Sequence, residues 1–193
     1  MATKDLEQTM VDIRASLLTD RNLFLYGEIN SNTCLRMQEQ LLFLNGEDET
    51  KEITMYINGP GGVISDGLGL IDIIKSIKAP VNTVCVGLAA SMSALIFING
   101  DRRYMLPNSQ LMLHQPLGGA FGQASDIELL SAQILKTKAN IHQMIANSSV
   151  LDVKKIEKLT DRDCYIDANT ALKYKLADEI LISDKIKNIK AKG

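Results

Sequence analysis

Ser91 and His114 are the side chains in this sequence that are best placed to carry out chemistry. Ser91 lies between the small residues of segment 87–90 and an apolar run at 92–98, whereas His114 ends an apolar segment and precedes a glycine-containing stretch. In α/β proteins, reactive groups often lie at the ends of strands beside such loops. The pair therefore predicts a serine nucleophile that is activated by a histidine acting as general base.

Less reactive roles remain open for both residues. Ser91 could be only the cap of the helix that residues 92–98 predict, and His114 could be a hydrogen-bonded structural histidine. Because Ser91 follows Gly87 by four residues, the segment is not a GxSxG nucleophile elbow. Ser93 is a rival nucleophile, but its offset of two residues places it on another side of the helix. The start of that helix would offer Ser91 free N–H groups and the positive dipole end, which suit a developing oxyanion.

A glycine cluster at residues 58–62, with the sequence Asn-Gly-Pro-Gly-Gly, follows an apolar strand. Such a cluster predicts a turn. A glycine here could also direct a backbone N–H group at a substrate as a second oxyanion donor, or offer an edge to an extended peptide. The sequence has neither GxxxxGK followed by serine or threonine nor a complete GxGxxG, so a phosphate-binding loop is excluded.

The third group of a serine–histidine site is a carboxylate that orients the histidine. Asp161-Arg162-Asp163 lies in a polar, turn-like stretch, which by itself predicts a solvated loop or a cap. The order Ser91, His114, Asp163 satisfies the logic of nucleophile, base and orienting acid, although spacing alone does not establish that the three residues meet. The second histidine, His142, lies inside a long amphipathic segment, which predicts a surface or inter-subunit residue.

Apolar periodicity alternates between the helical and the strand type along the chain. We expect helices at residues 4–18, 31–46 (capped by Ser31 or Asn32), around 68–74, at 92–98 and at 125–147, and strands at 22–26, 53–57, 82–86, 103–106, 110–114 and 179–182. This alternation predicts one α/β domain over residues 1–193, with a largely parallel sheet and right-handed connections. The tail at 184–193 holds four lysines against one aspartate and predicts a flexible, solvated end.

The composition excludes several classes of protein. Of the 193 residues, 46% are hydrophobic and 23% are charged, with a net charge of −2, so neither disorder nor generic binding to nucleic acid or a membrane surface is supported. The apolar runs are shorter than the roughly 20 residues that cross a bilayer. Cys34, Cys85 and Cys164 lie far apart without a CxxC pair, which predicts no disulfide framework, no metal site and a reducing, cytoplasmic location.

Taken together and in order, these motifs resemble the proteolytic subunit of the ATP-dependent Clp protease (ClpP). The matching segments are residues 56–62, 87–92, 106–109, 114–120, 122–124, 160–163 and 176–179, and the match extends from about residue 11 to 182. The resemblance implies a ClpP/crotonase-like fold: repeated strand–helix units, a mostly parallel sheet, and a protruding strand–helix handle at about 117–147.

The resemblance also implies roles for individual residues. Ser91 would be the nucleophile, His114 the general base and Asp163 the residue that orients it. The backbone N–H groups of Gly62 and Met92 would form the oxyanion hole. Peptide bonds would be hydrolysed with no metal and no cofactor.

For the assembly, the resemblance implies a tetradecamer of two stacked heptameric rings with the serines inside the chamber. The handle would interlock the rings, and Asp161 and Arg162 would form an ion-pair sensor between them. An AAA+ unfoldase, ClpX-like or ClpA/ClpC-like, would hydrolyse ATP and thread unfolded proteins into the chamber. The implied partners are therefore further copies, an unfoldase and unfolded polypeptides.

The sequence departs from the family pattern at several places. The segment before the first helix is short and lacks a Gly-Glu-Arg element, Gly59 stands where serine is usual, and Phe121 stands where a polar handle residue is usual. Phe121 could favour pairing with a ring of a paralogous subunit. Two alternatives therefore remain. The first is a weakly active or regulatory ring subunit that pairs with a paralogue. The second is a crotonase-type acyl-CoA enzyme, but the serine and histidine at the protease positions argue against it.

Overall fold

The computed structural model describes residues 3–182 as alternating helices and strands, so the predicted tail at 184–193 lies outside the described residues. The helices are α1 (Thr3–Thr19), α2 (Ser31–Glu47), α3 (Ile64–Ser76), α4 (Met92–Ile98), α5 (Ala124–Asn147), α6 (Val153–Leu159) and α7 (Ala168–Lys173). The strands are β1 (Asn22–Ile29), β2 (Ile53–Gly62), β3 (Val81–Ala90), β4 (Arg103–Met105), β5 (Gln110–Leu113), β6 (Cys164–Asp167) and β7 (Glu179–Ile180).

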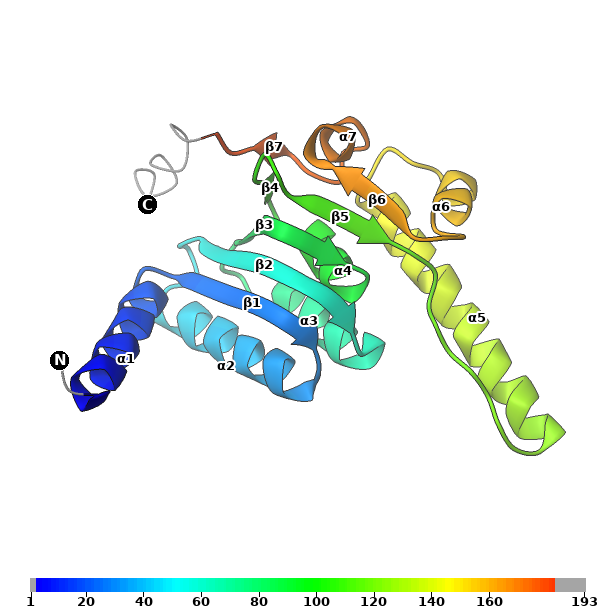
Figure 1. Cartoon of the computed structure of the whole chain (residues 1–193), viewed down its shortest axis with the longest axis horizontal. Helices are drawn as coiled ribbons and strands as arrows, with labels where there is room; N and C mark the ends of the chain where they lie inside the picture. The colour runs from blue at the N-terminus through cyan, green and yellow to red at the C-terminus, as the bar shows by residue number, and fades with distance from the viewer. Residues whose placement is uncertain (1–2, 183–193) are drawn as a thin grey trace.

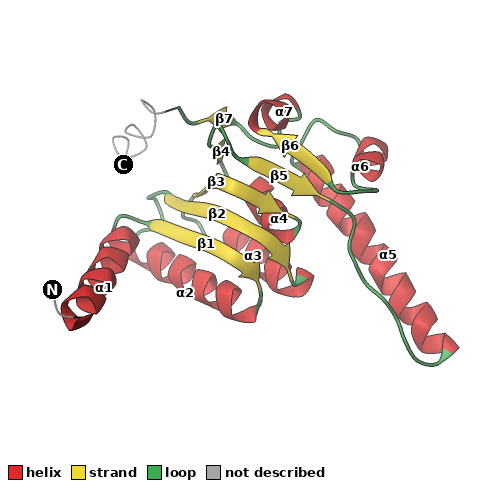
Figure 2. Cartoon of the chain, in the orientation of Figure 1, coloured by secondary structure: helices red, strands yellow, loops and turns green. Residues whose placement is uncertain are grey.

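The strands form one sheet in which every pairing is parallel except that of β5 with β6 (Figure 2). The order is β1-β2-β3-β4-β7, and β5 lies between β3 and β6. Strand β3 is long enough to pair with β4 along its first half and with β5 along its second half. The predicted α/β fold with a mostly parallel sheet is thus confirmed.

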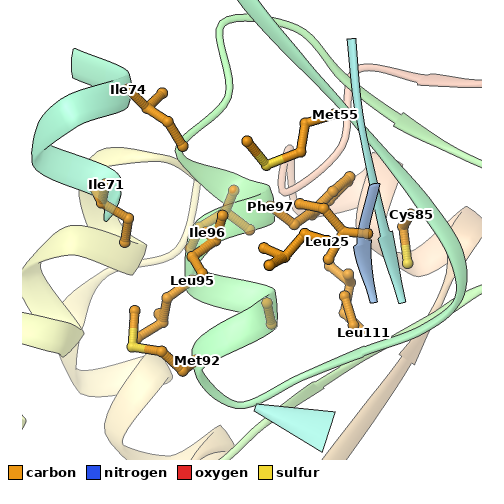
Figure 3. Packing of buried hydrophobic residues seen from close by; sticks show 14 of the residues in the cluster. Leu25, Met55, Ile71, Ile74, Cys85, Met92, Leu95, Ile96, Phe97 and Leu111 are labelled. Atoms are coloured by element: carbon orange, nitrogen blue, oxygen red, sulfur yellow. The ribbon is translucent and has the colours of Figure 1, made fainter. Parts of the chain in front are cut away.

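Helix α4 is the centre of the core. All seven of its residues are buried, which agrees with a sequence that has no polar face. Figure 3 shows Leu95, Ile96 and Phe97 of this helix among side chains from α3 and from the sheet. Full burial of one such side chain stabilises the fold by about 1.5–3 kcal/mol. The helix start, and with it Ser91, is therefore held by a completely buried helix of the main core.

The structure corrects two local predictions and adds three elements that were not predicted. The 58–62 glycine cluster is not a turn, because it continues β2 and stays paired with β1 and β3. The cap of α2 is Asn30 rather than Ser31 or Asn32, since Asn30 accepts from the Thr33 N–H while the Thr33 hydroxyl accepts from the Asn30 N–H. Elements α6, β6 and α7 were not predicted, because four to seven residues are too few to show a clear period.

Residues 114–123 run outward from the end of β5, and helix α5 returns alongside them to the body of the protein (Figure 1). Its buried residues, Ile141, His142 and Ile145, all lie in the half that packs on the body. In the described chain, residues 114–123 form a loop rather than the expected handle strand, because a strand needs a neighbouring strand to take up its backbone hydrogen bonds. The protruding handle within 117–147 is therefore a loop and a helix.

Candidate active site

Ser91 occupies the junction between β3 and α4 in a strained backbone conformation. Its φ and ψ are 52° and −119°, a region that residues with a side chain rarely adopt and that is typical of functional sites. Its N–H group donates to the carbonyl of Met112, 2.8 Å away, which ties the junction to β5. Its side chain makes no capping hydrogen bond, so the alternative role of helix cap is not supported.

The Ser91 hydroxyl lies against His114 instead. The distance between Oγ of Ser91 and Nε2 of His114 is 2.7 Å, a short hydrogen bond. The sheet explains the proximity: β3 and β5 are parallel, with Ala90 opposite Met112, so the residues that follow the two strands emerge at the same edge. His114 is partly buried, which limits the orientations of its ring.

Asp163 lies on the other side of the His114 ring. Its Oδ1 is 3.5 Å from Nδ1, which is ion-pair range but longer than a good hydrogen bond. The antiparallel pairing of β5 with β6 sets Cys164 opposite Leu113, so the residues just beyond that pair face each other. The Asp163 side chain is 60% exposed in the single chain, and catalytic hydrogen bonds are often long before substrate binds.

The glycine cluster brings backbone close to the serine. Gly61 has a φ of +96°, and a Cβ there would lie 2.6 Å from Cβ of Ser91 and 3.0 Å from the Met92 nitrogen. Gly62 has a φ of +150°, and a Cβ there would overlap the Ile29 carbonyl. Only glycine permits both approaches. Met92 begins α4, where helix N–H groups have no partner within the helix. The predicted oxyanion donors Gly62 and Met92 line the same pocket as Ser91.

A pocket of about 530 Å³ opens beside these groups. Ser91, His114, Gly62 and Met92 line it together with a group of apolar side chains, which are Val63, Ile64, Leu95, Leu113, Leu117, Ile141 and Ile145. Such a lining is suited to a hydrophobic side chain of a bound peptide. The pocket thus combines an apolar wall with a small set of polar groups at one end.

The remaining predicted residues lie outside this cluster. Asp161 and Arg162 are exposed, and Nε of Arg162 is 4.0 Å from Oδ2 of Asp161 within the same chain. Phe121 is completely exposed on the loop beside α5. Ser93 is fully buried, its Oγ has no hydrogen-bond partner, and it packs near Gly59, so it does not compete with Ser91 for His114.

The prediction that His142 is a surface or inter-subunit residue was wrong. Its side chain is buried within the chain, and Nε2 lies 3.0 Å from the Thr160 hydroxyl at the end of α6. Burial is the main cause that lowers the pKa of His142. Lys138 lowers it further, whereas Glu157 acts in the opposite direction. The error followed from the missed helix α6, because the face of α5 that α6 covers looked free.

Sequence reasoning also missed Gln115 and Lys138. The Lys138 ammonium donates to Oε1 of Gln115 at 2.9 Å, and Nε2 of Gln115 donates to the Asp161 carbonyl at 3.3 Å. The position of Gln115 directly after His114 was the available signal. These contacts link α5 to the loop that carries Asp163.

No helix within residues 3–182 is long and apolar enough to span a bilayer. No group of three or more histidine, cysteine, aspartate or glutamate side chains in that range is arranged to hold a metal ion.

Comparison with known families agrees with this fold. The model of the family described as Clp protease matches residues 5–184, nearly the whole chain. The match accounts for the mixed α/β architecture and the mostly parallel sheet. The chain therefore belongs to the Clp protease family and is a proteolytic, ClpP-like subunit of the serine peptidase type.

Proposed function

We propose that this chain is a serine endopeptidase in which Ser91 is the nucleophile, His114 the general base and Asp163 the residue that orients the imidazole. The observation that supports the proposal most directly is the 2.7 Å contact between Oγ of Ser91 and Nε2 of His114 at the mouth of the apolar pocket. A nucleophile within hydrogen-bond reach of a base, with a third group at the far nitrogen, is the arrangement that serine hydrolysis needs.

In the acylation step, Ser91 Oγ attacks the carbonyl carbon of the scissile bond while its proton passes to Nε2 of His114. The electron pair of the carbonyl moves to oxygen, where the N–H groups of Gly62 and Met92 stabilise the charge. When the tetrahedral intermediate collapses, the C–N bond breaks and the leaving amine takes the proton from His114. Water then attacks the acyl-Ser91 ester with His114 again as base, which releases the acid and restores the serine.

For the assembly we propose two stacked heptameric rings that enclose the serines, fed by an AAA+ unfoldase. The exposed apolar residues of the handle support this proposal, because Phe121 and Leu117 are costly to leave in water. Within this described loop, residues 117–122 make no backbone hydrogen bonds, so a second copy could pair with them as a strand. Because only unfolded polypeptides could enter the closed chamber, they would be the substrates, and the AAA+ unfoldase would hydrolyse the ATP.

The test is reaction of the purified protein with a fluorophosphonate and with a short fluorogenic peptide. We expect covalent labelling at Ser91 and peptide turnover, and we expect the Ser91→Ala variant to lose both, with kcat reduced by a factor of about 10⁶. Ser93→Ala is the matched control, because Ser93 is buried two residues away and faces no base. Turnover retained in Ser91→Ala, or lost in a folded Ser93→Ala, would contradict the proposal.

A second candidate function is a weakly active or regulatory ring subunit. The 3.5 Å separation and the exposure of Asp163 favour it, since the site of a single chain would then wait for a partner ring to complete it. Phe121, fully exposed where the family usually has a polar residue, would provide the contact with a paralogous ring. Slow fluorophosphonate labelling that speeds up on addition of the paralogue would support this candidate, and fast labelling of the isolated protein would contradict it.

A further inference from the structure

A buried polar pair joins α5 to the segment that carries Asp163. His142 on α5 and Thr160 at the end of α6 are both almost completely buried, and their side chains are 3.0 Å apart. The proposed reaction does not use either residue. Because an unpaired buried polar group costs about 1–3 kcal/mol, the buried Nε2 of His142 is stabilised by its contact with the Thr160 hydroxyl.

The hydrogen bonds of Thr160 assign the direction of this contact. Its hydroxyl lies 2.9 Å from the Ile156 carbonyl and donates its single hydrogen there. The hydroxyl oxygen must therefore accept from His142, whose Nε2 carries the hydrogen. The neutral imidazole then leaves Nδ1 as an acceptor, 4.0 Å from the Glu157 carboxylate, which is too far for a hydrogen bond. Burial and Lys138, which together outweigh Glu157 in lowering the pKa of His142, agree with a neutral ring.

Thr160 is in turn bonded to the segment that carries the general base. Its carbonyl accepts the N–H group of Gln115 at 2.9 Å, one residue after His114. On the other side, Asp163 follows Thr160 by three residues in a loop that ends where β6 begins. Thr160 is thus the anchor between the two residues whose separation decides how well His114 is oriented.

We propose that His142 is a positioning residue of the active site: its hydrogen bond to Thr160 holds the end of α6 against Gln115 and so sets the distance between Asp163 and His114. The inference rests on the proposed function. It assigns His142 no contact with substrate. The side chain acts through Thr160, and Lys138, one turn earlier on the same face of α5, supports the same junction through Gln115.

The experiment compares paired variants of the full-length protein with the short peptide as substrate. We expect His142→Phe, which keeps a ring but removes the donor, to lower kcat about 10- to 100-fold with little change in KM, because the reacting groups are misplaced and the substrate pocket is not. His142→Gln keeps an N–H donor and should recover most of kcat. Thr160→Val should match His142→Phe, Thr160→Ser should resemble the unmodified protein, and the double variant His142→Phe/Thr160→Val should be no slower than either single variant.

Controls separate positioning from loss of stability. Ile156→Val removes one methyl group from a buried side chain of α6 without removing the hydrogen bond, so it should lower the melting temperature and leave kcat unchanged. If His142→Phe does not fold, the Thr160 variants carry the same test. Because the chain has only two histidines, nitrogen-15 histidine spectra should resolve His142 and show hydrogen on Nε2 at neutral pH.

Three results would overturn the inference. The first is full kcat in both His142→Phe and Thr160→Val, and the second is a His142 ring with hydrogen on Nδ1 alone at neutral pH. The third is failure of His142→Gln to recover any of the loss. An unmodified protein that neither labels nor hydrolyses peptide would contradict the proposed function itself, and the inference with it.

Discussion

At the scale of single residues, the site depends on backbone that is held in unusual conformations. Ser91 has a positive φ, and Gly61 beside it has no side chain because a Cβ would collide with the serine. Such strain persists only where the surroundings are rigid, and the buried helix α4 together with the hydrogen bond to Met112 provides that rigidity. The hydroxyl is thereby presented to His114 rather than to the helix end.

The role proposed for Asp163 leads to a prediction about tautomers. Asp163→Asn should lower kcat by about 10⁴, because an amide can donate to Nδ1 and so favours the His114 tautomer that cannot accept the Ser91 proton. Stability should hardly change, since Asp163 is exposed. Steady-state kinetics with the short peptide measures the effect, and Asp72→Asn, at an exposed aspartate of α3 outside the pocket lining, is the control. A variant with nearly full kcat would show that another group orients the histidine.

At the scale of elements, the carboxyl ends of β3 and β5 place the serine and the histidine, and β6 brings the aspartate. Helices α5 and α6 then hold the loops beyond these strands. The far end of the sheet is secured separately by Arg103 on β4, which bonds Asp178 with two side-chain nitrogens and the Ser148 carbonyl with a third.

Removal of the Arg103 side chain should therefore lower the stability of the fold without changing the catalytic activity of the folded protein. In Arg103→Met we expect the free energy of unfolding to fall by about 2–3 kcal/mol, because half-buried Asp178 keeps the main-chain N–H group of residue 103 but loses the charge-assisted bonds from the Arg103 guanidinium. Chemical denaturation measures this, with Arg102→Met as the neighbouring exposed control. In the folded Arg103→Met variant, loss of peptide turnover greater than the loss of folded protein would contradict the separation of the two regions.

Stability should also depend on pH through the packing of α5 on α6. Burial lowers the pKa of His142, so below about pH 6.5 the unfolded chain binds a proton that the folded chain does not. Folding stability is therefore complete above that pH and falls as pH drops below it, by at most about 1.4 kcal/mol per unit. Denaturation at pH 7.5 and 5.5 measures the slope, and His142→Gln should make it smaller. If the pH dependence of stability were unchanged in His142→Gln, it would have to come from other groups.

A second group of residues titrates lower. The pKa of Asp167 is lowered by its cap bonds to Thr170, and that of Asp178 is lowered because bonds from Arg103 outweigh the opposing effect of burial. Their contributions are present above about pH 4 and are lost as pH falls below it. The loss of stability due to His142 and the loss due to these aspartates therefore fall in separate pH ranges and can be measured separately.

At the scale of the whole molecule, the exposed apolar surface of the handle suggests how copies assemble. Phe121, Leu117 and Leu129 are among its most exposed large hydrophobic side chains. Monomeric proteins seldom leave such residues together in water. Arg162 is 92% exposed, and its 4.0 Å contact with Asp161 leaves the guanidinium accessible for pairing across an interface.

Sedimentation velocity can test that proposal. Phe121→Ser and Arg162→Ala should shift double rings towards single rings and lower peptide turnover in parallel, because one contact would stabilise both. Val150→Ser, at an exposed valine away from the handle, is the control. Unchanged sedimentation together with unchanged turnover would refute the coupling.

The sequence by itself determined the type of most elements, the mostly parallel sheet and the three residues proposed for chemistry. Long apolar periods and linked motifs depend only on the order of residues along the chain, so they can be recognised without the three-dimensional structure. Only the tertiary structure decided that Ser91 faces His114 rather than capping α4, since both arrangements suit the same residues. The burial of His142 also depended on the fold. Its face of α5 is covered by α6, a later segment of the chain whose position the sequence pattern of α5 does not reveal.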